Sequence, residues 1–414
     1  MALTREERRN RFRMLVLQKV DGSVELSDGD MRLLIERVIR DSAEGGERLS
    51  VRERRETKKD VFDSLRGLDV LQDLMEDPAI TEIMVNGPEG IFFEKEGSLY
   101  QSDRHFFDRK RLEDVIQKIA AGVNRVVNEA NPIVDARLDD GSRVNAVLPP
   151  VSLSGPALTI RKFPKDRITM DRLIEMESIT VEAAEYLKVL VRAGYNIFVS
   201  GGTGVGKTTF LNVLSDYIPP TERIITIEDS AELQISNIPN LVRMEMRNAN
   251  MEGNHAVTIR DLIKTSLRMR PSRIIVGEVR DAASIDMLQS LNTGHNGMST
   301  GHANSPADML SRIETMVLLG EEIPLLAIRK QIASAIDIII QLSRLRDKTR
   351  RVTEIVEVTA CVNGEIELSP LFRFREEGED ENGRIIGKLQ HLGRKLVRRG
   401  KLLAAGEGEC LPII

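Results

Sequence analysis

The spacing of hydrophobic positions changes along the chain, and its first region has the spacing of helices. Leu33, Leu34, Val38 and Ile39 fall on one face of a predicted helix, as a 3.6-residue repeat requires. The stretch 41–46 (DSAEGG) interrupts this pattern. We therefore expect an N-terminal helical extension over residues 1–75. Its Arg- and Glu-rich stretches are typical of a solvated helix face, and the alternative is a docking surface for another protein.

Residues 76–163 carry short strand-like runs around one helical segment, which predicts an α+β domain. The helix is expected over 110–123, and Asp140-Gly141 predicts a hairpin between two of the strands. The expected strands are Thr81–Val85, Ile91–Phe93, Ile133–Arg137, Arg143–Val147 and Leu158–Arg161. Phe163-Pro164-Lys165-Asp166 then begins a hinge or linker expected over 164–174.

Residues 175–375 alternate apolar strand-like runs with helical segments, the pattern of a mainly parallel sheet covered by helices. The expected strands are Asn196–Ser200, Arg223–Ile227, Arg273–Gly277, Met298–Gly301 and Ile336–Leu342. Two more, 352–360 and 365–369, are joined by Asn363-Gly364 and predict a hairpin. After Glu376 the chain becomes acidic and then basic, so we expect a peripheral C-terminal appendage over 376–414.

Composition narrows the class of protein. The 414 residues are 41% hydrophobic and 30% charged, which indicates a globular protein of two or three domains. Proteins that bind nucleic acids usually carry basic patches and aromatic rings that stack on bases. This chain has a net charge of −5, 4% aromatic residues and no Trp, which argues against a nucleic-acid partner. Two cysteines, Cys361 and Cys410, cannot build a disulfide framework or a four-thiolate zinc site.

The sequence also predicts a location. The first residues lack the apolar run of a signal peptide, and the longest apolar stretches fall far short of the ~20 residues that span a bilayer. We therefore expect a cytoplasmic protein whose association with a membrane is peripheral and comes through a partner.

One motif predicts phosphate binding. Residues 201–208 (GGTGVGKT) fit G-x-x-x-x-G-K-[ST], and they lie between a predicted strand and a predicted helix. Such a loop turns its N–H groups toward phosphates, the lysine reaches the β- and γ-phosphates, and the threonine hydroxyl ligates Mg²⁺. We therefore expect ATP and Mg²⁺ as ligands. The residues expected to bind the nucleotide are Gly201, Gly202, Thr203, Gly204, Val205, Gly206, Lys207, Thr208 and Thr209, with Thr208 on the metal.

Acidic residues follow two of the predicted strands. Glu278 ends the strand 273–277, and the carboxyl ends of parallel strands meet the phosphate loop at one edge of the sheet. We interpret Glu278 as the base that activates a water. Glu228 and Asp229 end another strand and are candidates to bind Mg²⁺ or to assist the base. The alternative is that Asp229 caps a helix and Glu228 lies at the surface.

Two histidines flank a further predicted strand. His295 precedes it and His302 follows it, and an imidazole here could sense the γ-phosphate and relay its loss. The alternative is a structural role for each. The histidines lack the spacing of a metal site, so no structural zinc is expected.

Arginines outside the loop domain are candidates to reach the phosphates, because phosphoryl transfer benefits from an added cation. Arg137, Arg143 and Arg161 lie on predicted strands just before the hinge. The alternative for them is surface salt bridges. Arg260, Arg268 and Arg270 could equally come from a neighbouring subunit.

Taken in order, these motifs resemble those of the secretion-superfamily ATPases, and most closely the CpaF-type ATPases that assemble Tad/Flp (type IVb) pili. The resemblance runs from about Asp77 to the C-terminus. The stretches that carry it are 83–88 (IMVNGP), 135–138 (DARL), 140–147 (DGSRVNAV), 159–163 (TIRKF), the phosphate loop, 227–229 (IED), 258–262 (TIRDL), 267–271 (LRMRP), 273–281 (RIIVGEVRD) and 293–295 (TGH).

The resemblance implies a homo-hexameric motor with a RecA-like P-loop domain, a preceding α+β domain and nucleotide at the domain interface. It implies that Glu228 and Asp229 form an acidic box, that Gly277-Glu278 is a second acidic motif and that His295 and His302 form a histidine box. Arg137, Arg143 and Arg161 match the arginines of the family's N-domain. One departure is Gly301, where the family usually has an apolar residue before the second histidine.

The implied function is a cytoplasmic ATPase that hydrolyses ATP to ADP and phosphate to power Tad/Flp-type pilus assembly or secretion across the inner membrane. The implied partners are a polytopic inner-membrane platform protein and, through it, pilin subunits. Two alternatives stay open. A RecA-like nucleic-acid motor is disfavoured by the acidic charge and the few aromatic residues, and a non-hydrolysing scaffold is disfavoured by Glu278.

Overall fold

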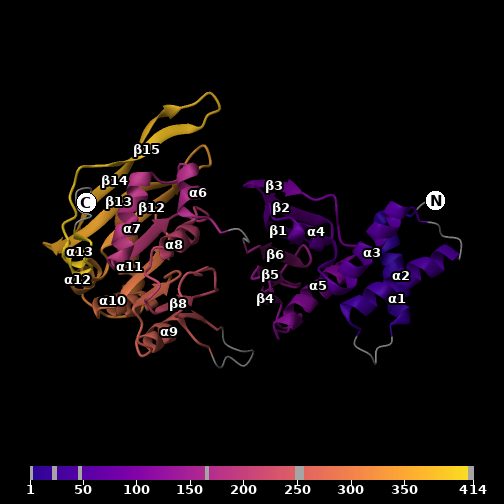
Figure 1. The fold of residues 1–414 in the computed structure, drawn as a ribbon. Coiled ribbons are helices and arrows are strands. Elements are labelled where there is room, and N and C mark those ends of the chain that lie inside the picture. Colours follow the sequence, from indigo (N-terminus) through magenta and orange to yellow (C-terminus); the bar gives the residue numbers. More distant parts are fainter. Residues whose placement is uncertain (1–2, 21–25, 45–48, 164–166, 248–255, 409–414) are drawn as a thin grey trace. The chain divides into compact units, whose positions relative to one another are not determined.

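The computed structural model describes residues 3–20, 26–44, 49–163, 167–247 and 256–408. The chain forms two compact units, residues 1–166 and residues 167–414 (Figure 1). Among the described residues, no helix is at once long enough and apolar enough to cross a membrane.

Unit 1 begins with a bundle of three helices, α1 (Arg5–Lys19), α2 (Asp28–Glu44) and α3 (Val51–Arg66). Capping boxes start α1 at Thr4 and α3 at Ser50, and they satisfy N–H groups that a helix leaves unpaired. Phe12, Val16 and Ile35 are fully buried in the bundle core. The helical extension is therefore a packed bundle, as its apolar periodicity predicts.

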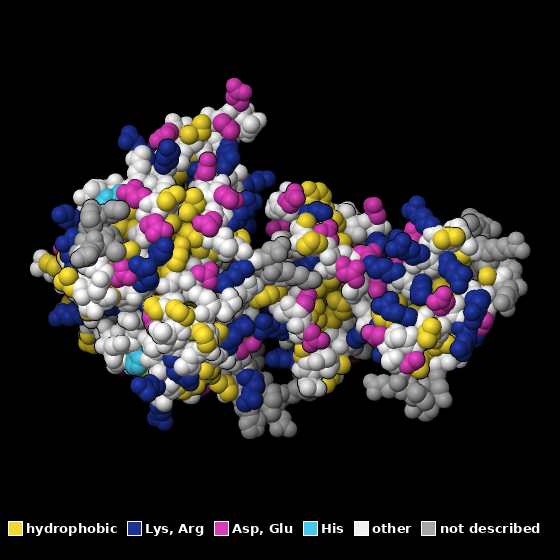
Figure 2. Space-filling model, in the orientation of Figure 1, with side chains coloured by type: hydrophobic (Ala, Val, Ile, Leu, Met, Phe, Trp, Pro, Cys, Tyr) yellow, Lys and Arg dark blue, Asp and Glu magenta, His cyan; other side chains and the backbone are white. Residues whose placement is uncertain are grey.

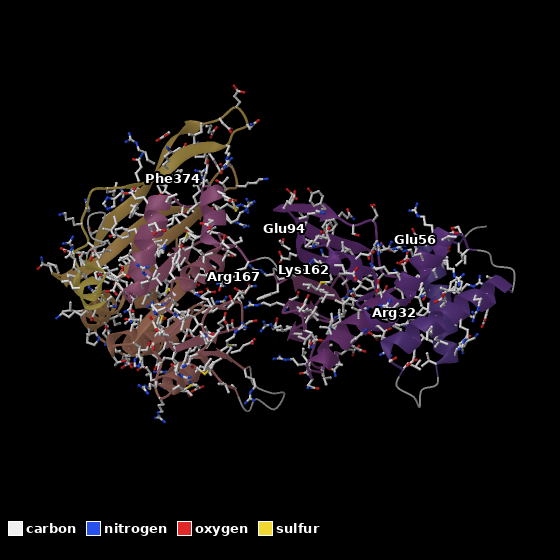
Figure 3. The ribbon with its side chains drawn as sticks, in the orientation of Figure 1. Arg32, Glu56, Glu94, Lys162, Arg167 and Phe374 are labelled. Atoms are coloured by element: carbon white, nitrogen blue, oxygen red, sulfur yellow. The ribbon has the colours of Figure 1, made fainter. Side chains whose placement is uncertain are left out.

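The charged stretches of this bundle are partly inward-facing. Arg5 makes two hydrogen bonds of 2.7 Å to Asp60, and Arg8, which is 7% exposed, bonds Glu53 across helices. The guanidinium carbon of Arg32 lies 3.7 Å from the centre of the Phe62 ring (Arg32 is labelled in Figure 3). On the face drawn in Figure 2, basic and acidic side chains are interspersed over the bundle. Several of these charged side chains therefore form contacts between helices, which neither the solvated face nor the docking surface predicted.

The rest of unit 1 is a six-stranded antiparallel sheet in the order β3-β2-β1-β6-β5-β4. A short turn and helix, η1 (Asp69–Leu71) and α4 (Gln72–Glu76), lead into it, and α5 (Arg109–Gly122) packs its apolar side into the sheet's core. The strands are β1 (Ile80–Asn86), β2 (Gly90–Lys95), β3 (Ser98–Gln101), β4 (Ile133–Arg137), β5 (Arg143–Val147) and β6 (Ala157–Arg161). Only β3 had no counterpart among the expected strands, since its four residues are all exposed and carry no apolar alternation.

Unit 2 is built on a nine-stranded sheet in the order β15-β14-β13-β12-β7-β11-β10-β8-β9, parallel from β12 to β9 and antiparallel beyond β12. The strands are β7 (Ile197–Gly201), β8 (Ile224–Glu228), β9 (Leu241–Glu245), β10 (Arg273–Val276), β11 (Asn296–Gly301), β12 (Ile338–Arg344), β13 (Arg350–Val362), β14 (Glu365–Glu379) and β15 (Ile385–His391). The helices are α6 (Met170–Glu175), α7 (Val181–Arg192), α8 (Lys207–Ser215), α9 (Ile259–Ser266), α10 (Ala283–Asn292), α11 (Pro306–Leu318), α12 (Leu325–Ala335) and α13 (Gly400–Ala404).

Two apolar cores cover the two faces of this sheet. Helices α7 and α8 contribute to one core, and α9 to α12 contribute to the other. The five strands expected within 196–342 are all present, and the hairpin at Asn363-Gly364 joins β13 to β14. The strand β9 was missed, because its residues are only partly buried at the sheet edge.

The C-terminal region differs from the expected peripheral appendage. Strand β14 continues to Glu379, so residue 376 lies inside a strand, and β15 extends the same sheet. Leu389, Leu396 and Leu402 are buried in a core of unit 2. The acidic run is therefore the end of a hairpin, and isolated leucines anchor the segment that follows it.

The expected linker 164–174 also proves shorter. Residues 164–166 lie outside the described residues, and α6 already begins at Met170. On one side Lys162 donates hydrogen bonds to the backbone oxygens of Leu74 (3.2 Å) and Asp77. On the other side Arg167 bonds Asp216 Oδ1 at 2.5 Å, immediately after α8 (Lys162 and Arg167 are labelled in Figure 3). The chain is thus fixed to its own unit up to Lys162 and from Arg167 onward.

Candidate functional site

The glycine-rich loop follows β7, which lies between β12 and β11 near the middle of the sheet. The loop ends at Gly206, which adopts φ = 93° and caps the N-terminus of α8. This left-handed conformation is one that side chains other than glycine rarely adopt. Thr208 and Thr209 are half-buried in the first turn of α8, where a helix concentrates unpaired N–H groups and partial positive charge.

Lys207 is folded back on the loop. Its Nζ donates to the carbonyl oxygens of Gly201 at 3.1 Å and Gly202 at 2.7 Å, and it lies 3.2 Å from His302 Nδ1. Burial lowers the pKa of Lys207, while the nearby Glu278 carboxylate opposes that change. The ammonium group is thus held by neutral acceptors that phosphate oxygens could replace.

Glu278 follows β10 at the same edge of the sheet, as predicted. Its Oε1 lies 2.9 Å from His302 Nε2, and its Oε2 accepts a 2.7 Å hydrogen bond from Arg280. Burial works to raise the pKa of Glu278. The hydrogen bond and charge of Arg280, with the charge of Lys207, outweigh burial and leave the pKa lowered. An ionised carboxylate therefore stands beside the loop lysine, joined to it through one imidazole.

His302 follows β11 and links these two groups. Because the Lys207 ammonium can only donate, Nδ1 of His302 must accept, and Nε2 then carries the hydrogen that Glu278 receives. Burial lowers the pKa of His302, with Glu278 opposing, which fits this neutral tautomer. Gly301, the departure noted above, has a packing reason: a Cβ there would lie 2.7 Å from Met309 Sδ and 2.8 Å from a Phe198 ring carbon.

The acidic pair after β8 splits into two environments. Glu228 is 2% exposed, and its Oε1 accepts from the N–H groups of Glu232 (2.7 Å) and Leu233 (2.8 Å). Its Oε2 is buried and has no hydrogen-bond partner among the described residues, and burial raises the pKa of this carboxyl. Asp229 is 43% exposed and accepts from Arg280 at 3.3 Å. Glu228 therefore organises the following loop, while Asp229 faces the charged site.

His295 is placed away from the loop. It precedes β11 whereas His302 follows it, and β11 runs parallel to β7, so the strand's six residues separate the two histidines. At about 3.3 Å per residue, that puts them on the order of 20 Å apart, at opposite edges of the sheet. Within this chain His302 lies at the phosphate loop and His295 does not; His295 instead lies 3.3 Å from Thr293 Oγ1.

Arg260 is held within its own unit. It bonds Asp286 at 2.7 Å and Glu321 at 2.5 Å, so its charge stabilises the packing of α9 against α10. Arg268 and Arg270 are exposed.

The three arginines of unit 1 come together. Arg137 pairs with Arg143 across β4 and β5, and Arg143 pairs with Arg161 across β5 and β6. Directly opposed residues on antiparallel strands project to the same face. The alternating buried residues of these strands show that this face is the one turned away from the apolar core. The arginines therefore form one row, which the sequence order alone did not reveal.

Sequence analysis missed Arg280. It stands two residues after Glu278 and bridges the carboxylates of Glu278 and Asp229, which follow neighbouring strands. The available signal was a basic residue two positions after a strand-end acid, but identifying its second partner requires the order of strands in the sheet.

Comparison with known proteins places the chain in a family. The model of the type II/IV secretion system protein family matches residues 65–381. The chain belongs to this family and is therefore a secretion-type ATPase. The matched region includes the six-stranded sheet of unit 1 and the whole phosphate loop, and excludes most of the helical bundle.

Two relatives and one solved structure illustrate the similarity. A Mycobacterium tuberculosis protein named for conjugal transfer is 36% identical over 298 residues, which cover 70% of this chain and 84% of that protein. The conjugal transfer protein TrbB of Rhizobium radiobacter is 31% identical over 308 residues, covering 73% and 91%. The pilus retraction motor PilT, solved with ADP, aligns with a TM-score of 0.51 at 18% identity over 83% of this chain and 88% of PilT. PilT supports the fold alone, and it confirms the expected α/β class.

Proposed function

We propose that this protein is a homo-hexameric ATPase that acts at the cytoplasmic face of the inner membrane and powers assembly of Tad/Flp-type pili. The observation that carries the catalytic part is the connected series Lys207–His302–Glu278 beside the phosphate loop. The family membership supports the motor function, and the motifs quoted above support the Tad subtype. A polytopic membrane platform protein and, through it, pilins are the proposed partners.

The residues at the site fit ATP with Mg²⁺. The amides of 202–208 and the start of α8 are suited to phosphate oxygens, and Lys207 supplies a cation. No group of three or more His, Cys, Asp or Glu side chains able to hold a metal is gathered within the described ranges. Mg²⁺ commonly takes one or two protein carboxylates together with phosphates and water. Thr208, Asp229 and the unpaired Oε2 of Glu228 are the proposed protein ligands, and the ion would neutralise phosphate charge there.

In the proposed reaction, Glu278 orients a water whose oxygen bonds to the γ-phosphorus, and the bond to the bridging oxygen of ADP breaks. Glu278 takes the proton of that water. Lys207 exchanges the carbonyls of Gly201 and Gly202 for phosphate oxygens, and His302 Nδ1 then loses its partner. His302 thereby reports occupancy of the loop to Glu278. The arginine row of unit 1 is proposed to add cations to the phosphates, so that nucleotide state and the angle at the hinge are linked.

A second candidate is a motor of a conjugation or type IV secretion system. It is favoured by the relatives, since TrbB and the Mycobacterium protein are named for conjugal transfer. The two candidates share the site and differ in the membrane partner. Co-purification with the Tad platform protein, compared with a conjugation-system partner, distinguishes them.

The test of the catalytic assignment is Glu278→Gln. The amide keeps the shape of the side chain and removes the base, so turnover should fall by about a hundredfold or more, while binding of a fluorescent ATP analogue persists. Glu182→Gln, an exposed change at the start of α7, serves as the matched control. Unaltered phosphate release by Glu278→Gln would remove Glu278 from this role.

A further inference from the structure

Arg280 is the cation that joins two strand ends at the site. Its Nη2 donates to Glu278 Oε2 at 2.7 Å, and its Nη1 donates to Asp229 Oδ2 at 3.3 Å. Asp229 follows β8 and Glu278 follows β10, which are parallel neighbours with Ile227 opposite Val276. Two carboxylates at adjacent strand ends repel each other, and the planar guanidinium between them satisfies both.

The Glu278 carboxylate is held at both oxygens by unlike partners. His302 holds Oε1, and His302 is itself hydrogen-bonded to Lys207. Arg280 holds Oε2, and its other hydrogen bond within the described ranges goes to Asp229 rather than to the phosphate loop. When the Lys207 ammonium turns to phosphate oxygens, His302 loses its hydrogen bond to Lys207. The hydrogen bond from Arg280 to Glu278 does not involve Lys207. Arg280 is thus the partner able to keep the carboxylate plane fixed in both conditions.

The charges around the site add to this picture. Burial lowers the pKa of Lys207 and of His302, and the charges of Arg280 and of Arg312 on α11 act in the same direction. The side chain of Arg280 is 58% exposed, while that of Glu278 is 17% exposed. Because more than half of Arg280 faces solvent, its hydrogen bonds to the two carboxylates are its main contribution to the site.

We propose that Arg280 is a positioning residue for ATP hydrolysis, which aims the Glu278 carboxylate by a hydrogen bond anchored on Asp229. The inference rests on the proposed function of Glu278 and adds the residue that directs it. A fixed carboxylate matters because displacing a reacting group by about 1 Å costs on the order of a hundredfold in rate. Arg280 acts through Glu278 and need not touch the nucleotide.

The test compares Arg280→Gln with Arg373→Gln in the full-length protein. Arg373 is a matched control, since it is 59% exposed and bonds Glu354 at 2.6 Å between β13 and β14. In Arg280→Gln, kcat should fall by about tenfold to a hundredfold, with KM and the affinity for a fluorescent ATP analogue unchanged. Arg280→Lys should recover part of kcat, because lysine keeps the charge but lacks the rigid planar fork that fixes the carboxylate plane. Arg373→Gln should keep wild-type values.

A second arm asks whether Arg280 works through Glu278. In single-turnover reactions with Glu278 already replaced by Gln, adding Arg280→Gln should lower the residual rate no further. A further loss in that background, or a weakened nucleotide affinity, means that Arg280 contacts the nucleotide directly and overturns the proposal. A wild-type kcat in Arg280→Gln also overturns it.

Failure of the base assignment gives a different result, since Glu278→Gln would then keep its turnover. If Arg280→Gln melts early, Arg280→Lys decides: partial kcat at unchanged KM supports the proposal, and full kcat contradicts it.

Discussion

Asp63 of α3 shows how a single residue can carry a pH dependence. Its carboxyl is buried enough in unit 1 that burial raises its pKa to about 6, and the opposing charge of Lys59 does not cancel this. Asp60, three residues earlier, has the bidentate partner Arg5. The folded bundle therefore favours the protonated form of Asp63, whereas the unfolded chain ionises it near pH 4.

We expect Asp63→Asn to remove part of the bundle's pH dependence. For an acid whose pKa is raised by folding, the stabilising contribution is complete below the unfolded pKa and is lost as pH rises through the folded pKa. The window is therefore about pH 4 to 6. Hydrogen exchange in α3 of the full-length protein should accelerate across this window, and less so in Asp63→Asn. The same slope in Asp63→Asn as in wild type, with exposed Asp103→Asn as control, contradicts the assignment.

At the site, the sequence could predict which residues lie at the sheet edge but not how they pair. Lys207 is fixed by its motif, and Glu278 by its place after a parallel strand. The tautomer of His302 and the bridging role of Arg280 depend on loop conformation, which no periodicity encodes. His295 and His302 flank one strand, which puts them at its opposite ends, so the sequence position alone does not bring both to the phosphate loop.

At the scale of elements, the C-terminal segment 392–408, here called the strap, has contacts that the sequence did not predict. Asp337 at the start of β12 has a side chain only 2% exposed, and its charged partners are Arg398 at 3.0 Å and Lys401 at 2.7 Å. Glu357 on β13 is fully buried and accepts from the N–H groups of Val397 and Arg398. Both carboxylates thus depend on the strap, which ties it to the sheet.

We expect Arg398→Ala to destabilise unit 2 strongly. Losing a hydrogen bond to a charged group typically costs about 1.5–3 kcal/mol, and here the buried Asp337 carboxylate keeps only Lys401 as a charged partner among the described residues. Replacing Asp337 by Asn in the same protein should restore part of this loss, since the buried charge is then gone. Guanidinium unfolding of the single and double variants measures both effects, with exposed Arg394→Ala as control. A midpoint for Arg398→Ala equal to that of the control would show that the strap does not bear on stability.

The core strands were predictable and the strap was not, for a physical reason. Strands buried on both faces read as continuous apolar runs, as in 224–227 and 338–340. The strap is held instead by single leucines and by polar contacts whose partners lie between 41 and 207 positions earlier. Such distant pairs leave no local pattern.

At the scale of the whole molecule, each unit contributes a different set of charges. Unit 2 holds the phosphate loop, Glu278 and its partners, while unit 1 holds a row of arginines on one sheet face. Like charges placed directly opposite on neighbouring strands are unfavourable. A row of three such residues concentrates positive charge on one face of the sheet, and we propose that it meets the nucleotide phosphates.

The assignment predicts that the arginine row controls turnover from outside unit 2. Arg143 is central, since it is the one that pairs with both Arg137 and Arg161. Arg143→Gln should lower kcat, and the triple change to Gln should lower it by at least about a hundredfold, as loss of a transition-state arginine does. The amides of the loop and Lys207 remain, so the dissociation constant of an ATP analogue should change far less than kcat. Phosphate release and fluorescence titration on the same preparations measure the two quantities, and Arg125→Gln, an exposed change elsewhere in unit 1, is the control. If the triple variant turns over like this control, the row serves some other anion, and hydrolysis is complete within unit 2.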